Sequence, residues 1–132
     1  MSFTVLLLED AEKDIEAIYR YIQKSGNKKA ARDMIITIRN ACDSLSENPE
    51  RGHTPNELSQ VGLFDYRQII VKKYRIIYQV AVPNIFIFGI IHGNRNIGEV
   101  LRQRMLLWIF VDLWLNPTVY GILGYVTLVR RV

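Results

Sequence analysis

The chain has little of several features that would place it in a special class. Only one of its 132 residues is a cysteine, Cys42, so no disulfide can form within the chain, and a reducing compartment, the cytoplasm, is expected. The first eight residues lack both the basic start and the cleavage site of a signal peptide. The chain also lacks the low hydrophobic content of disordered proteins, because 49% of its residues are hydrophobic. This excludes a disordered chain. One compact domain with Cys42 in its core is therefore expected.

Acidic residues are scarce in the second half of the chain. Between Arg67 and Arg104, seven Lys or Arg residues stand against Glu99 alone, a net charge of +6, whereas residues 9–16 carry a net charge of −4. A basic region of this kind suits phosphate or an acidic partner. Strands also carry Lys and Arg simply on their solvated face. The charge pattern alone leaves both interpretations open.

Apolar spacing predicts a strand followed by two helices. Residues 3–8 form a short apolar run that is typical of a strand. Apolar residues at helical spacing then predict one helix that starts at Asp10, whose side chain we expect to cap it, and that stops at Gly26-Asn27. A second amphipathic helix is predicted over residues 28–46. So short a link between two such helices predicts an antiparallel hairpin.

Three further strands are predicted after a polar loop. Residues 47–63 hold two prolines and two glycines and indicate a surface loop. Tyr, Ile and Val then dominate residues 66–71, 74–82 and 85–91, with breaks at Lys72-Lys73 and at Pro83-Asn84. These segments predict an antiparallel meander.

A short helix is predicted after the meander. Asn96 with Glu99 three residues later resembles a capping box, so the helix should start there and end near Leu107. The expected fold class is α+β, with the antiparallel helix hairpin packed on a small, mostly antiparallel sheet in the order β-α-α-β-β-β.

The C-terminal segment differs in character from the rest. Only Asp112 is charged between Met105 and Val129, but Asp112 and Asn116-Pro117 interrupt the apolar run before it reaches the roughly 20 residues of a membrane span. We therefore do not expect a membrane helix. An extra strand or helix covering the sheet, a dimer contact and an irregular extension remain open. The predicted division is a domain over residues 1–106 and a hydrophobic extension over residues 107–132.

The order of these elements, together with ENPERG, DYRQIIVKKYRIIYQV and IIHGNRN, resembles the RelE/ParE superfamily of bacterial toxins from type II toxin–antitoxin modules. The resemblance covers about residues 3–106, and its most specific parts are residues 74–78 and 92–95. It implies a cytoplasmic, growth-inhibiting toxin that a cognate antitoxin neutralises. The antitoxin would bind the basic meander, through Arg67, Lys72, Lys73, Arg75 and Arg95. Neither a metal nor a cofactor is implied.

The ending HG-x-R at residues 92–95 is similar to ParE-like members, which lack a full catalytic set. This resemblance implies a toxin that poisons DNA gyrase, contacting it through the helix hairpin and the C-terminal arginines. The alternative is a RelE-like, ribosome-dependent and metal-independent mRNA endoribonuclease. A third alternative is a degenerate toxin that keeps only antitoxin binding.

The endoribonuclease alternative implies specific catalytic residues. Arg75 matches the strand arginine that holds phosphate in ribonuclease members, and Arg67 would add charge. Glu57 and His92 would serve as acid–base groups, although His92 lies one position early and lacks the adjoining tyrosine.

Structural roles compete with these catalytic ones. Arg75 is also placed to pair with Asp65 or Glu57. His92 stands where a strand ends, and its ring is also suited to bonding a nearby carbonyl. Tyr74 and Tyr78 share one strand face and are expected in the core.

Overall fold

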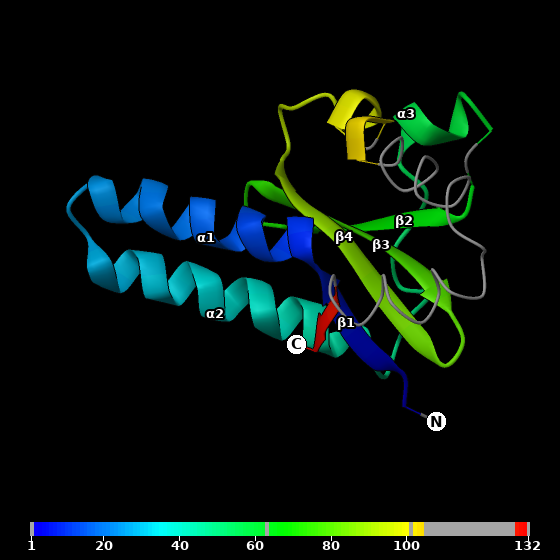
Figure 1. Ribbon diagram of the computed structural model, residues 1–132, viewed down its shortest axis with the longest axis horizontal. Helices are drawn as coiled ribbons and strands as arrows, with labels where there is room; N and C mark the ends of the chain where they lie inside the picture. Colours follow the sequence, from blue (N-terminus) through cyan, green and yellow to red (C-terminus); the bar gives the residue numbers. More distant parts are fainter. Residues whose placement is uncertain (1, 63, 101, 105–128, 132) are drawn as a thin grey trace.

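The computed structural model describes residues 2–62, 64–100, 102–104 and 129–131. Within them the strands form one sheet in the order β2-β3-β4-β1-β5 (Figure 1). β1 is parallel to β4, and the other neighbouring strands are antiparallel. The predicted α+β class with a mostly antiparallel sheet is thus confirmed. The strands are β1 (Thr4–Leu8), β2 (Tyr66–Val71), β3 (Tyr74–Ala81), β4 (Asn84–His92) and β5 (Val129–Arg131).

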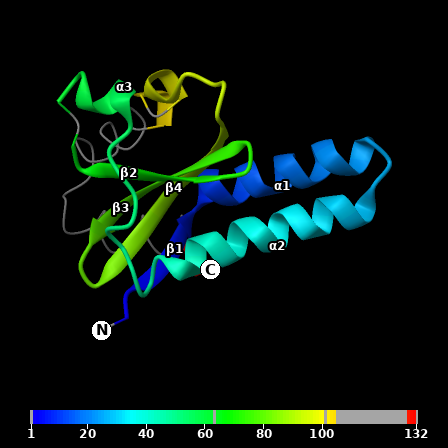
Figure 2. The ribbon, with the colours of Figure 1, turned by 180° about the vertical axis from the view of Figure 1, so that it is seen from behind.

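Two long helices form the predicted antiparallel hairpin. Helix α1 (Glu9–Lys24) follows β1 directly, and α2 (Lys28–Ser44) returns beside it. Seen from behind, the hairpin extends well beyond the edge of the sheet (Figure 2). Apolar residues at helical spacing face the sheet because burying them removes apolar surface from water. The buried ones are Ala11, Ile15 and Ile18 in α1 and Ala31, Ile38 and Cys42 in α2.

The helix ends follow local chemistry with one exception. Gly26 has φ +88°, a conformation that glycine adopts without steric cost, and it turns the chain between the helices. The Asn27 side chain caps α2 by accepting a hydrogen bond of 2.9 Å from the Ala30 N–H. The predicted Asp10 cap is wrong, because α1 starts at Glu9 and its N-cap residue, Leu8, makes no side-chain bond. Strand β1 runs straight into the helix, so Asp10 already lies in its first turn.

The meander is present as predicted. β2 and β3 are joined at Lys72-Lys73, where Lys72 has φ +57°, and β3 and β4 are joined at Val82-Pro83. Beyond β4, residues 97–100 and 102–104 are helical, and the Glu99 N–H donates to Asn96 Oδ1 at 3.1 Å. The predicted start of this helix at Asn96 is therefore confirmed.

The sheet buries apolar side chains on both faces. Successive residues of a strand point to opposite faces, so β3 divides its side chains between two clusters. Tyr74, Ile76 and Tyr78 join the main core against the helix hairpin, which confirms the core positions of both tyrosines. Ile77 joins a smaller cluster on the opposite face. We call these the helix face and the open face of the sheet.

The open face is covered by elements on either side of the meander in the sequence. Residues 47–63 were expected to form a loop without a helix, but they contain α3 (Asn56–Ser59). Leu58 of this helix is buried in the smaller cluster together with Ile97 and Val100. Burial of these apolar side chains draws α3 and the segment after Asn96 together, and both lie at the same end of the molecule in Figures 1 and 2.

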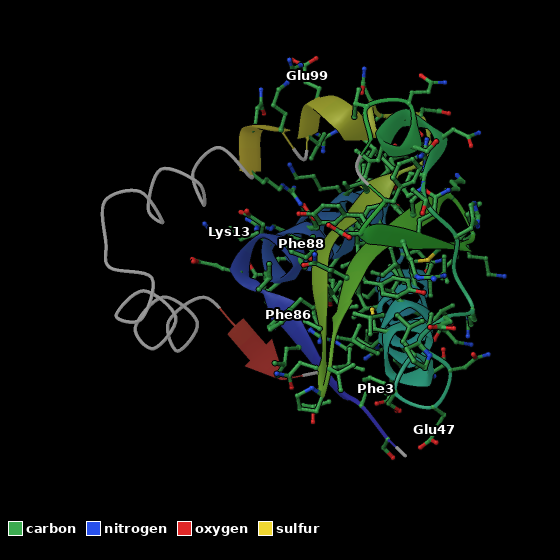
Figure 3. The ribbon with its side chains drawn as sticks, turned by 90° about the vertical axis from the view of Figure 1, so that its right-hand side faces the viewer. Phe3, Lys13, Glu47, Phe86, Phe88 and Glu99 are labelled. Atoms are coloured by element: carbon green, nitrogen blue, oxygen red, sulfur yellow. The ribbon has the colours of Figure 1, made fainter. Side chains whose placement is uncertain are left out.

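The C-terminal segment is described only at residues 129–131. These residues form β5, which pairs antiparallel with β1 and lies along its outer edge (Figure 3). An extra strand on the sheet was one of the open alternatives, and it applies to these residues. The predicted helix end near Leu107 and the apolar run to residue 128 lie outside the described residues. In the part of the chain that the structure describes, no helix is both long enough and apolar enough to cross a membrane.

Candidate functional site

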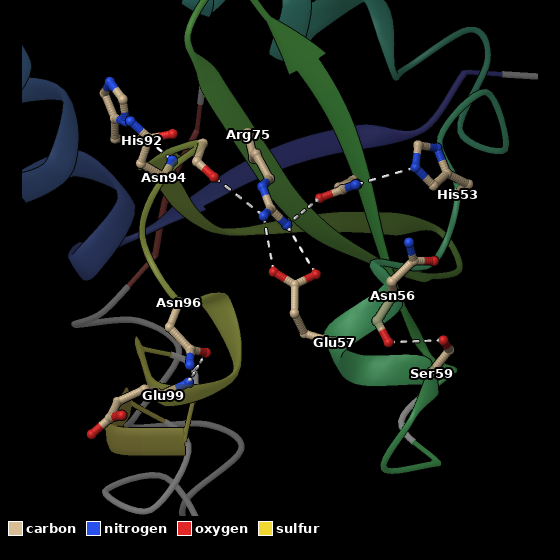
Figure 4. A network of polar contacts seen from close by, with 11 residues as sticks. His53, Asn56, Glu57, Ser59, Arg75, His92, Asn94, Asn96 and Glu99 are labelled. Carbon is tan, nitrogen blue, oxygen red and sulfur yellow. Dashed lines mark hydrogen bonds and ion pairs between the residues drawn. The ribbon is translucent and has the colours of Figure 1, made fainter.

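Arg75 is the centre of a polar network on the open face (Figure 4). Its guanidinium donates to both carboxylate oxygens of Glu57, at 3.2 and 2.9 Å. It also donates to Gln68 Oε1 at 3.2 Å and to the Gly93 carbonyl at 3.3 Å. Gln68 in turn lies 3.1 Å from His53, between Nε2 atoms. The network thus joins α3, the meander and the end of β4 through one arginine.

A well-anchored loop brings Glu57 to this network. The buried Tyr78 hydroxyl donates to the Pro49 carbonyl at 2.7 Å and accepts from the Gly52 N–H at 3.0 Å. A Cβ on Gly52 would lie 2.5 Å from the Gln68 carbonyl oxygen, so only glycine lets the loop approach β2 this closely. These contacts hold the loop that leads into α3, and α3 carries Glu57.

The pairing changes the acid–base character of Glu57. Hydrogen bonds from the Arg75 guanidinium lower the pKa of the Glu57 carboxyl below its usual range, against the smaller opposing effect of burial. Glu57 is therefore a carboxylate at neutral pH. Both of its oxygens and the facing guanidinium nitrogens are occupied by each other. A phosphate would have to displace Glu57 to bind Arg75 in the same two-pronged way.

His92 lies on the other face of the sheet. In the β3–β4 ladder it is paired with Tyr74, whereas Arg75 is paired with Ile91, and Ile91 belongs to the open-face cluster. The His92 ring packs edge-on against Tyr74 with 5.8 Å between centroids. Figure 4 shows the ring pointing away from Arg75. The structure therefore brings Arg75 and Glu57 together but does not bring His92 to them.

The remaining basic residues separate into two groups. Arg67, near the start of β2, donates to the backbone carbonyls of Glu50 and Gly52 at 3.3 and 2.8 Å. Lys72, Lys73 and Arg95 are exposed at the other end of the meander, where the Gly93 N–H donates to the Lys73 carbonyl at 2.8 Å. We call these three residues, with Arg75, the basic end of the sheet. Arg67 stabilises the loop before α3 instead.

The sequence-based prediction missed two polar features, the residue Gln68 and an ion pair between Asp14 and Arg104. Gln68 is only 7% exposed and links His53 to Arg75, but nothing in the sequence marks it except an inward position in a strand. The second is a pair between Asp14 and Arg104, with nitrogen–oxygen distances of 2.9 and 2.8 Å. Ninety residues separate the two, so no local pattern could have indicated it.

Comparisons with known proteins agree with this fold. A model of the family described as "ParE toxin of type II toxin-antitoxin system, parDE" matches residues 5–97. A solved chain from the "Chromosomal ParDE TA system from P. aeruginosa" is similar, with a TM-score of 0.58 at 17% identity over 69% of this chain and 96% of that chain. At this identity the structural likeness supports the fold alone. A search of curated protein sequences found no match.

Proposed function

This chain belongs to the ParE toxin family of type II toxin–antitoxin systems, and from this we propose that it binds and poisons DNA gyrase in the cytoplasm until a cognate antitoxin neutralises it. We favour binding over catalysis because the hydrogen-bonding groups of Arg75 are already occupied. Its guanidinium is held by Glu57, Gln68 and a backbone carbonyl. No acid–base histidine of the predicted set stands beside it, since His92 lies on the helix face.

The assay for gyrase poisoning uses the purified full-length chain and a supercoiling reaction. We expect loss of supercoiling while mRNA in a translating extract stays intact, as mapped by primer extension. Glu57→Gln is the informative variant, because it removes the carboxylate charge and keeps the side-chain size. A gyrase poison should keep its effect in this variant, since Glu57 is not expected to reach the enzyme. Unimpaired supercoiling with the wild-type chain would contradict the proposal.

A second candidate function is RNA cleavage, and one observation favours it. Arg75 and Glu57 lie together on the open face, and the lowered pKa of Glu57 keeps it ionised as a base. If the pair opened to admit a phosphate, cuts at codon-related positions would appear in the same extract. Glu57→Gln should then reduce cutting by about 100-fold, the usual scale of acid–base catalysis. A chain that causes neither effect would fit the degenerate toxin, which only binds its antitoxin.

The antitoxin is proposed to bind the basic end of the sheet. Lys72 and Arg95 are exposed, and no described acidic residue forms an ion pair with either of them. An acidic partner would gain attraction there that salt screens. Arg75→Ala and Lys72→Ala should each weaken the complex with the antitoxin, more at low salt than at high salt. Lys28→Ala, at the exposed tip of the helix hairpin, is the matched control. If the affinity for the antitoxin is the same in both variants as in the wild type, and the same at low and high salt, this surface is excluded as the binding site.

A further inference from the structure

A cavity of about 300 Å³ lies on the helix face, between α1 and the ends of β3 and β4. This volume is at the lower limit of sites for small molecules. Ile18 and Ile90, both buried, give it apolar walls. The Tyr21 ring, 73% exposed, stands at its edge. The cavity is separate from the Arg75 network, which occupies the opposite face of the sheet.

The charges that line the cavity favour an anion. Lys73 and Arg95 both line it, and neither forms an ion pair with a described acidic residue. Asp14 is the lining carboxylate, but its oxygens accept from the Arg104 guanidinium and from the Ile90 N–H at 2.9 Å. Asp14 is therefore already neutralised, and the two free cations determine the sign of the site.

Two further hydrogen-bond donors, the Tyr74 hydroxyl and the His92 ring, belong to residues that line the same cavity. Tyr74 is 7% exposed and lines the cavity, yet its hydroxyl has no partner among the described residues. Burial, and less strongly the nearby Tyr21, raises the pKa of Tyr74, so the hydroxyl keeps its proton. His92 Nδ1 accepts the Asn94 N–H at 3.2 Å, so Nε2 is the ring nitrogen left to donate a hydrogen bond. A ligand oxygen would give the Tyr74 hydroxyl the hydrogen-bond partner that it lacks among the described residues.

We propose that this cavity binds a nucleoside monophosphate, either free or as the 5′ end of a nucleic-acid strand. A phosphate presents three acceptor oxygens to the ammonium, guanidinium, hydroxyl and imidazole donors, one more than a carboxylate presents. The base would stack on the Tyr21 ring above the apolar walls, because every base has a π face that aromatic side chains accept. This binding goes beyond the proposed toxin function, and it shares Lys73 and Arg95 with the surface proposed for the antitoxin.

The first test is an NMR titration of the full-length chain with AMP, with adenosine and inorganic phosphate as matched probes. AMP should bind with a Kd below about 1 mM and shift the ring signals of Tyr74 and His92. Each fragment should bind at least about tenfold more weakly, since each fills half of the site. No shift with AMP at about 5 mM, or phosphate binding as tight as that of AMP, would overturn the proposal.

Variants then locate the site. Tyr74→Phe removes one hydroxyl and keeps the packing, and it should weaken AMP binding about threefold to tenfold. Arg95→Ala should weaken it at least as much, and Lys28→Ala, outside the cavity, should leave it unchanged. A thermal melt of each variant checks that the fold is intact. If both cavity variants are folded and bind AMP as tightly as the wild type, the site is refuted. A 5′-phosphorylated dinucleotide that binds as tightly as AMP identifies a strand end as the ligand, and weaker binding identifies the free nucleotide.

Discussion

Two arginine–carboxylate pairs in this protein share one geometry but differ in their surroundings. Arg75 donates to both oxygens of Glu57 and to the Gly93 carbonyl. Arg104 likewise donates to both oxygens of Asp14 and to the Phe88 carbonyl at 3.2 Å. The arginine side chains are equally shielded, at 17% and 18% exposure. Any difference in their roles must therefore come from the carboxylates and the elements that carry them.

The carboxylates differ in burial and in what else they hold. Asp14 is 14% exposed, lies in a 16-residue helix and also accepts the Ile90 N–H, at a point of β4 beyond its pairing with β1. Glu57 is 34% exposed and lies in a four-residue helix. Burial would lower the pKa of Arg104, but the hydrogen bonds and charge of Asp14 outweigh it and raise that pKa. The Asp14 pair is a clamp between α1, β4 and the C-terminal helical segment, whereas the Glu57 pair ties a short, more exposed helix to the sheet.

The largest expected effect comes from breaking the clamp. Among the described residues, Arg104→Ala leaves the Ile90 N–H as the only hydrogen-bond donor to the shielded Asp14 carboxylate, and the variant should lower the free energy of unfolding by about 3 kcal/mol. Urea denaturation measures it. Arg102→Ala, on the same helical segment but 68% exposed and 3.9 Å from Glu99, is the control and should cost about 0.5 kcal/mol or less. Equal losses in the two variants would contradict the clamp.

A smaller loss of stability is expected when the loop that leads to Glu57 loses its anchor, the Tyr78 hydroxyl. Tyr78→Phe removes a fully buried hydroxyl and leaves the Pro49 carbonyl and the Gly52 N–H without it, which should cost about 2 kcal/mol. The loop before α3 should also exchange its amide protons faster, as hydrogen exchange would record. Tyr21→Phe, at an exposed position, should change neither quantity. Unchanged exchange in the loop would show that Glu57 is placed by other contacts.

A glycine substitution sharpens the comparison, because it acts on one pair only. A Cβ on Gly89 would lie 2.5 Å from Arg104 Nη1 and 3.2 Å from Asp14 Oδ2, so Gly89→Ala should displace the guanidinium and cost about 1 to 2 kcal/mol. In the Arg104→Ala background this cost should shrink, since the nearest atom is gone. Unfolding measurements on the four proteins of this cycle test the coupling. Strict additivity would disprove it.

The smallest effect concerns the pH dependence of the Arg75–Glu57 pair. The pKa of Glu57 is lowered in the folded chain from an ordinary value of 4.5, so the ionised group stabilises the fold above pH 4.5. That stabilisation is lost as the pH falls through the folded-state pKa. The free energy of unfolding of the wild type should therefore exceed that of Glu57→Gln by about 0.5 kcal/mol at neutral pH, and this difference should disappear in acid. An advantage that grows in acid would reverse the assigned sign.

Local patterns predicted most of the secondary structure, because periodicity and turn chemistry act over a few residues. The helix hairpin, the three strands of the meander and the helix start at Asn96 all appear where the sequence indicates them. The cap at Asp10 was wrong and α3 was missed, since both depend on how neighbouring elements meet. The candidate site was predicted in part. Arg75 pairs with Glu57, one of the two acids expected for it.

The sequence by itself determined the α+β class, the basic charge of the meander and the resemblance to the RelE/ParE superfamily, because these rest on patterning and short motifs. Only the tertiary structure decided which side chains meet. Strand register places Arg75 and His92 on opposite faces, although only seventeen positions separate them. Packing of α1 against β4 brings Asp14 to Arg104 across ninety positions. Within one strand, the alternation of side chains shows from the sequence which residues share a face. Contacts between distant elements instead depend on how the whole core is buried.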